Sequence, residues 1–190
     1  MPSEPIVGVD KYQHILVAID ASETSRYAFD AALQLARESD AQLQPLYVVD
    51  NPLMAYDASG YDPKILREAF AEEGRRFLAD AQARMKREKV SGAPRIVNVA
   101  AVGEDIAERI RVAAREFQAD LLVLGTHGRR GFRRLLLGSV AERVVRSACC
   151  PVLLVPAPHE QAAHDVRKLH GDVAAVMYEI PRQADKPAGK

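Results

Sequence analysis

The sequence predicts a single open β-sheet of five parallel strands with helices on both faces. Short apolar runs alternate along the chain with longer segments in which apolar residues recur at helical spacing. The runs are apolar at successive positions, which is typical of strands that are buried on both faces. A strict alternation of strands and helices favours right-handed crossovers and therefore a parallel sheet.

The five expected strands are the apolar runs at residues 14–19, 43–49, 95–102, 120–124 and 152–155. The first run ends at Asp20, an acidic residue at the carboxyl end of its strand. Pro45 lies inside the second run. Because proline lacks a backbone N–H, we expect that strand at an edge of the sheet or with a bulge near its start.

Helices are expected in the segments between these strands, at residues 23–39, 63–90, 106–117 and 139–147. Ser22 is placed to cap the first helix, and Glu23 is favourable near its positive end. Asp62 and Pro63 open the second helix, because they combine a capping residue with a proline at the first helical position. The Pro, Gly and Asp content of residues 51–62 indicates a loop.

Composition excludes several classes of protein. The 190 residues include 26 Lys or Arg and 26 Asp or Glu, and this balance argues against a dedicated nucleic-acid binder. The longest apolar stretch, 148–155, is interrupted by Pro151 and is shorter than the ~20 residues of a membrane span. No secretory signal is visible. Cys149 and Cys150 form neither a disulfide framework nor a zinc quartet, and we expect both to be buried. These features favour a cytoplasmic protein without a membrane or nucleic-acid partner.

A candidate anion site follows the fourth strand. Ligands of open parallel sheets bind beyond the carboxyl ends of the strands. Gly125 and Gly128 lie at such an end, where the absence of a Cβ lets backbone N–H groups approach an anion. Gly138 and Ser139 open the next helix, whose free N–H groups offer a second anion site. The intervening arginines could add charge-assisted contacts; they are Arg129, Arg130, Arg133 and Arg134.

The spacing of these residues, Gly-x2-Gly-x9-Gly-Ser, resembles the motif of the ATP-binding branch of the universal stress protein family. The segments HILVAIDASETS, at 14–25, and SACCPVLLVP, at 147–156, resemble the same family. The resemblance implies a Rossmann-like fold, similar to that of the adenine nucleotide alpha hydrolases. It also divides the chain into a nucleotide-binding domain, 1–156, and a C-terminal extension, 157–190.

The resemblance implies a set of contacts with ATP, which we expect to bind with Mg²⁺. Ala18 would line the base pocket, Asp20 would meet the nucleoside, and the backbone of Val48 would contact the adenine edge. Leu124 would start the phosphate loop. The residues expected around the ribose and phosphates are Gly125, His127, Gly128, Arg129, Gly138, Ser139 and Val140. Asp20 could instead only cap the first helix, and His127 could be a general base, a phosphate donor or a loop residue.

Two functions fit such a site. One is a stress-response module whose conformation or assembly follows nucleotide occupancy, and the other is a slow ATPase or phosphotransferase. A catalytic role requires a base and a group that orients it, and no such pair can be assigned in this sequence. The binding module is therefore the preferred interpretation.

The last expected strand and the C-terminal extension bear on whether two copies of the chain associate. Strand 152–155 is expected at one edge of the sheet, where unpaired backbone groups with apolar side chains promote association. We expect a homodimer through antiparallel pairing of this strand with its copy in a second subunit. The alternative is that the apolar patch 173–180 covers the edge within one chain. The extension could also be a solvated tail.

Overall fold

The fold is a twisted six-stranded sheet between two layers of helices. A computed structural model describes residues 12–50, 63–99, 104–128, 137–156 and 176–178. The strand order is β3-β2-β1-β4-β5-β6, and all pairings among β1 to β5 are parallel. The predicted five-stranded parallel α/β fold is therefore confirmed, with one antiparallel strand added at its end.

The elements follow the predicted order. The strands are β1 (His14–Ile19), β2 (Gln42–Val49), β3 (Arg95–Asn98), β4 (Leu121–Gly125), β5 (Val152–Val155) and β6 (Val176–Tyr178). The helices are α1 (Glu23–Ser39), α2 (Pro63–Arg87), α3 (Ile106–Glu116) and α4 (Ser139–Ser147). Strand β3 is shorter than the predicted 95–102, and residues 100–103 lie outside the described part of the chain.

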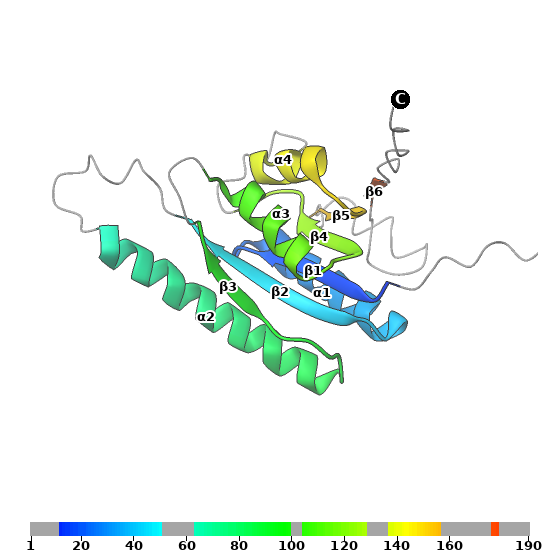
Figure 1. The fold of residues 1–190 in the computed structure, drawn as a ribbon. Coiled ribbons are helices and arrows are strands. Elements are labelled where there is room, and N and C mark those ends of the chain that lie inside the picture. The colour runs from blue at the N-terminus through cyan, green and yellow to red at the C-terminus, as the bar shows by residue number, and fades with distance from the viewer. Residues whose placement is uncertain (1–11, 51–62, 100–103, 129–136, 157–175, 179–190) are drawn as a thin grey trace, which may run out of the picture.

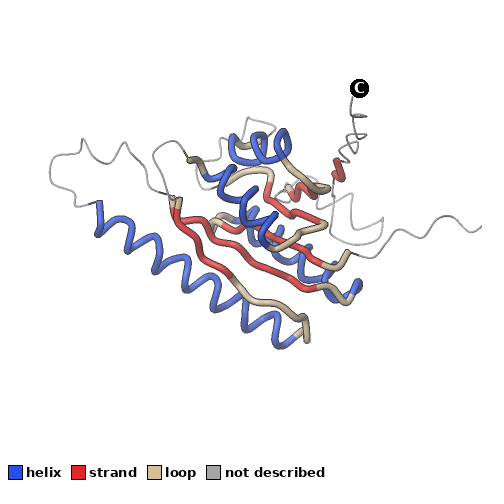
Figure 2. The backbone as a smooth tube through the Cα atoms, viewed as in Figure 1, coloured by secondary structure: helices blue, strands red, loops and turns tan. Residues whose placement is uncertain are grey.

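The helices cover both faces of the sheet. Figure 1 shows α1 and α2 on one side of the strands and α3 and α4 on the other, and the tube view in Figure 2 shows the same layers. Successive strand residues point to opposite faces, so Ile15 and Val17 join one buried cluster whereas Leu16 joins the other. The sheet thus has one core on each face, which explains why the strands are apolar at successive positions rather than alternately apolar and polar.

Pro45 lies inside the sheet, so the predicted edge position of its strand is wrong. β2 is flanked by β1 and β3, and Pro45 is paired with Val17 of β1. The ladder with β3 begins only at the next residue, where Leu46 is paired with Arg95. On its β3 side, Pro45 thus precedes the first ladder pair, a position where a missing N–H costs little.

Side-chain caps fix two helix starts at the end of the sheet where the strands finish. Ser22 Oγ accepts a hydrogen bond from Ser25 N at 3.2 Å, which confirms the predicted cap of α1. Asp105 caps α3 by accepting from Glu108 N at 2.9 Å. This hydrogen bond, together with the Arg143 guanidinium, lowers the pKa of Asp105, which favours the ionised cap. Arg143 belongs to α4, so the same carboxylate joins α4 to the start of α3.

The two cysteines have different surroundings. Cys150 is buried as predicted, but Cys149 is exposed, so the expectation that both pack inside is wrong. Burial raises the pKa of Cys150 to about 12, with smaller contributions from Cys149 and Asp120. The Cys150 thiol is therefore protonated and unreactive at neutral pH.

Native protein is accordingly expected to react with iodoacetamide at Cys149 alone. Cys150 is protected both by its burial and by its raised pKa, whereas Cys149 is exposed. Intact-mass analysis at pH 8 should show one added group, rising to two in denaturant. The Cys149→Ser variant is the control and should stay unlabelled until it unfolds. Two added groups on the native wild-type chain would contradict the assigned burial.

The edge of β5 is occupied by β6 of the same chain. β6 is antiparallel to β5 and pairs along all three of its residues, from Leu154↔Val176 to Val152↔Tyr178. The structure thus has the alternative arrangement, in which the apolar patch 173–180 contributes the covering strand. Pairing of β5 with a second subunit remains a prediction, and it would require β6 to leave this edge.

Candidate functional site

Three predicted apolar site residues lie on one face of the sheet near the ends of adjacent strands. Ala18 is on β1, Val48 on β2 and Leu124 on β4, and β1 lies between the other two strands. Leu124 is a buried member of the core cluster on the α3 and α4 side, and Ala18 and Val48 are partly buried against that cluster. The small side chain of Ala18 therefore lies between larger neighbours, close to the carboxyl end of the sheet.

Asp20 faces the glycine turn that follows β4. A Cβ built on Gly128 would lie 2.5 Å from Asp20 Oδ2, so the carboxylate nearly touches the backbone of this turn. The other oxygen, Oδ1, accepts from Ser22 N at 3.0 Å. Ala21 lies between Asp20 and Ser22 in the sequence and has a left-handed φ of 67°, a conformation that is strained for a residue with a side chain. Asp20 thus stabilises the strained turn at Ala21 and also lies against Gly128.

The glycines let separate parts of the chain approach one another closely. A Cβ on Gly125 would lie 2.9 Å from Thr24 Oγ1, and one on Gly138 would lie 3.2 Å from the carbonyl oxygen of Thr126. The sequence predicts close approach of an anion at Gly125 and Gly128, and a helix start at Gly138. In the structure, Gly125 is needed first to admit Thr24, and only Gly128 is exposed.

The start of α4 forms a second wall of the site. Gly138 is the N-cap, and its backbone N–H donates to Thr126 O at 2.7 Å, which joins α4 to the glycine turn. No side chain caps this helix among the described residues, and Ser139 is exposed. Val140, the next predicted residue, packs partly buried against the α3 and α4 core. The first turn of α4, whose N–H groups have no side-chain cap, therefore begins beside the turn beyond β4, and the exposed Ser139 is its first residue.

His127 is held within the turn. Its Nδ1 lies 3.0 Å from Thr126 Oγ1, and its carbonyl oxygen accepts a hydrogen bond from Thr24 Oγ1. The structure therefore brings His127 to the predicted turn but gives it contacts typical of a loop residue. Arg129 and the other arginines of the bridge lie outside the described residues, so their expected contacts stay predictions.

Thr24 is the site residue that the sequence analysis missed. It is 6% exposed and touches the turn through both its hydroxyl and its Cβ region. Thr24 and His127 are 103 positions apart, so no local spacing pattern relates them. The only indication in the sequence was that Thr24 is a polar residue in the first turn of a helix that follows the carboxyl end of a strand.

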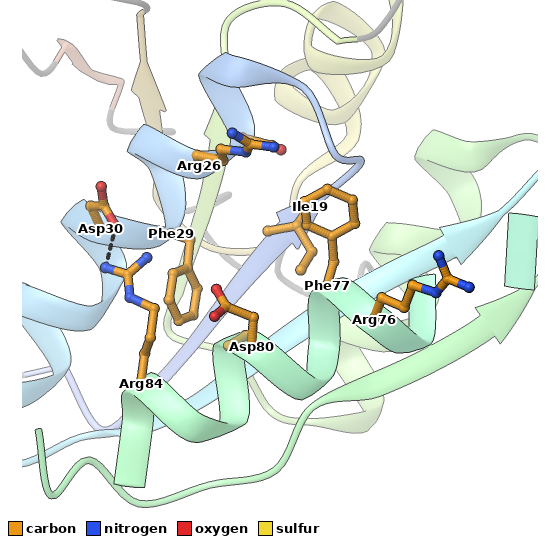
Figure 3. A pocket seen from close by; sticks show the side chains of 10 residues that line it. Ile19, Arg26, Phe29, Asp30, Arg76, Phe77, Asp80 and Arg84 are labelled. Atoms are coloured by element: carbon orange, nitrogen blue, oxygen red, sulfur yellow. Dashed lines mark hydrogen bonds and ion pairs between the residues drawn. The ribbon is translucent and has the colours of Figure 1, made fainter. Parts of the chain in front are cut away.

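A cavity of about 450 Å³ lies elsewhere, between α1 and α2. Figure 3 shows Arg84 over the ring of Phe29 and paired with Asp30; the Arg84 guanidinium is 4.9 Å from the ring centroid. Arg26 lies 5.6 Å from the ring centroid of Phe77 in the same cavity. Both arginines are thus engaged by the walls themselves. The cavity is on the α1 and α2 face, away from the face that carries Ala18.

The described residues include no group of three or more His, Cys, Asp or Glu side chains that could hold a metal ion. Among the helices that the structure describes, none has the length and apolar character needed to cross a bilayer.

Comparison with known proteins identifies the family. Residues 11–156 match the universal stress protein family. A universal stress protein of Methanocaldococcus jannaschii is 35% identical over 162 residues, which cover 81% of this chain and 88% of that protein. This chain, with its glycine turn between Asp20 and the start of α4, belongs to the universal stress protein family.

Solved structures of relatives agree with this assignment. A universal stress protein family member from Burkholderia pseudomallei is 51% identical, with a TM-score of 0.63; the match covers 80% of this chain and all of that one. A universal stress protein solved in complex with cAMP is 28% identical, with a TM-score of 0.57, and the match covers 78% of this chain and 99% of that one.

Proposed function

We propose that this chain is a cytoplasmic stress-response module that binds ATP beyond the carboxyl ends of β1, β2 and β4. The observation that carries the proposal is the convergence of three elements on the glycine turn. Asp20 approaches the turn from β1, Thr24 from α1, and Gly138 from α4. Such an arrangement combines an acidic group for ribose hydroxyls with backbone N–H groups for phosphates.

The apolar end of the site favours a planar base. Ala18, Val48 and Leu124 lie on neighbouring strands of one face, where Ala18 and Val48 are only partly buried and offer an apolar surface. The backbone of Val48 would supply hydrogen bonds to the adenine edge. The relative solved with cAMP supports an adenine nucleotide as the ligand class in this family.

Mg²⁺ fits this site as a companion of the nucleotide. The ion is usually held by one or two carboxylates together with substrate phosphates. Asp20, whose carboxylate lies next to the turn, and the exposed Ser139 hydroxyl would be the oxygen donors of the chain. When bound, the ion would neutralise phosphate charge.

The purified protein provides a first test of the proposal. Native mass spectrometry should detect a fraction of chains carrying an adenine nucleotide, and that mass should disappear on dialysis against a metal chelator. Added ATP should restore it. Recovery of a different class of ligand, such as a flavin, at the same stoichiometry would contradict the proposal.

Hydrolysis is expected to be slow. Rapid phosphoryl transfer needs a positioned water or base and strong charge neutralisation, and His127 is instead engaged within the turn. Phosphate release should therefore stay far below the ~10 s⁻¹ typical of enzymes. An enzyme-like rate in the wild type that is lost in His127→Ala would overturn this expectation and favour the ATPase alternative.

We further propose that two chains form a homodimer through β5 when its edge is free. β5 has buried apolar side chains and is bordered by Pro151 and Pro156, which limit how far a pairing can extend. Antiparallel pairing about a two-fold axis satisfies the backbone of both copies at once. The C-terminal extension would regulate this step, because β6 uses the same edge.

A further inference from the structure

Thr24 is one of two polar side chains among the described residues that are buried in this fold. It belongs to the first turn of α1, yet its hydroxyl hydrogen-bonds to the carbonyl oxygen of His127 in the turn after β4. A buried hydroxyl group is costly unless its hydrogen bonds are made. The Thr24 contact is therefore a specific link between two distant parts of the proposed nucleotide site.

The direction of each hydrogen bond at Thr24 is determined by the available atoms. The carbonyl oxygen of His127 can only accept, so Thr24 Oγ1 donates its single hydrogen there. Ser22 Oγ lies 3.1 Å from Thr24 Oγ1 and must then donate to it. Ser22 Oγ in turn accepts from Ser25 N at 3.2 Å. Neither hydroxyl has a spare hydrogen, so the position of the turn relative to α1 is closely specified.

The shape of the contact adds to this link. A Cβ on Gly125 would lie 2.9 Å from both Cβ and Oγ1 of Thr24, so the end of β4 packs directly on the threonine. On the other side of α1's first turn, Ser22 N donates to Asp20 Oδ1 at 3.0 Å. One short network thus joins Asp20, Ser22 and Thr24 to the backbone of the glycine turn.

We propose that Thr24 is the positioning residue of the nucleotide site, holding the turn Gly125–Gly128 at the separation from Asp20 that the nucleotide requires. This inference rests on the proposed function. Thr24 acts through its hydroxyl group and does not itself contact the nucleotide. Without that group, the His127 carbonyl loses its donor and the turn is free to move away from Asp20.

The test compares three variants of the full-length chain. Thr24→Val keeps the shape and removes the hydroxyl, whereas Thr24→Ser keeps the hydroxyl and removes a methyl group. Ser25→Ala is the matched control, because Ser25 is also buried in the first turn of α1 but donates to Ser22 O and lines the α1 and α2 cavity. For each variant, calorimetry gives the ATP affinity, and thermal melting without nucleotide gives the stability.

Thr24→Val should bind ATP about tenfold more weakly than the wild type, since a buried acceptor loses its partner. Thr24→Ser should bind ATP close to wild-type strength. Ser25→Ala should lower the melting temperature and leave the ATP affinity unchanged. Wild-type affinity in Thr24→Val, or an equal loss in Ser25→Ala, would overturn the positioning role.

A measurement without ligand keeps this inference separate from the proposed function. Backbone amide resonances of His127 and Gly128 should shift in Thr24→Val and not in Ser25→Ala, because the Thr24 hydroxyl bonds to the turn whereas the Ser25 hydroxyl bonds to Ser22 O. Failure of the wild type to bind ATP would remove the proposed function. Unchanged turn resonances in Thr24→Val would instead remove the positioning role.

Discussion

In the Gly128→Val variant, ATP binding is expected to be lost while the chain stays folded. A Cβ at this position would lie 2.5 Å from Asp20 Oδ2, so the carboxylate must move. The branched side chain would also occupy the path of the phosphates. Calorimetry should register a fall from micromolar affinity, about −8 kcal/mol, to no measurable binding.

The fold should tolerate this substitution. Gly128 is exposed, and its φ lies outside the left-handed region that strains side chains. Circular dichroism and the melting temperature should therefore stay close to those of the wild type. Ala83→Val is a suitable control, because it adds the same side chain to an exposed position near the end of α2. A Gly128→Val variant that binds ATP normally would contradict the placement of the phosphates.

Removal of the C-terminal extension is expected to convert the protein from monomer to dimer. A chain that ends at Pro158 lacks β6, so the β5 edge is left without the partner that it has in the full-length chain. An apolar edge strand with unpaired backbone groups associates readily. Light scattering at micromolar concentration should give one chain mass for the full-length protein and two for the truncated one.

A variant within β5 completes this experiment. Leu154→Pro in the truncated chain removes a backbone donor from the edge and should restore the monomer. Equal dimer formation by the full-length and truncated chains would show that β6 does not control the edge. Monomers in both would show that the β5 edge is not an interface.

Most of the fold could be predicted from local patterns. Strands buried on both faces have continuous apolar runs, and Ser22 has the chemistry of a helix cap, so both were recognised directly. The interior position of Pro45 could not be predicted. It is possible because the ladder between β2 and β3 begins at Leu46, one residue after the proline. Likewise, Asp120 accepts from Gln13 N and His14 N at 2.7 and 3.0 Å, a link that only the folded sheet reveals.

The site was predictable where it depends on spacing and not where it depends on tertiary contacts. The glycine pattern indicated the turn after β4 and the start of α4, which the structure joins through Gly138 N and Thr126 O. The reason for Gly125 was different from the predicted one, because its missing Cβ admits Thr24. Exposure of Cys149 was also missed, since adjacent residues in a connection can point to opposite environments.

Calorimetric titration of the full-length wild-type protein with ATP, in buffer containing Mg²⁺, tests the central claim most directly. We expect one site per chain with micromolar affinity, and weaker binding of GTP and FMN, because Ala18 and Val48 offer a small apolar surface suited to adenine. Absence of any heat of ATP binding, or equal affinity for the three ligands, would contradict it.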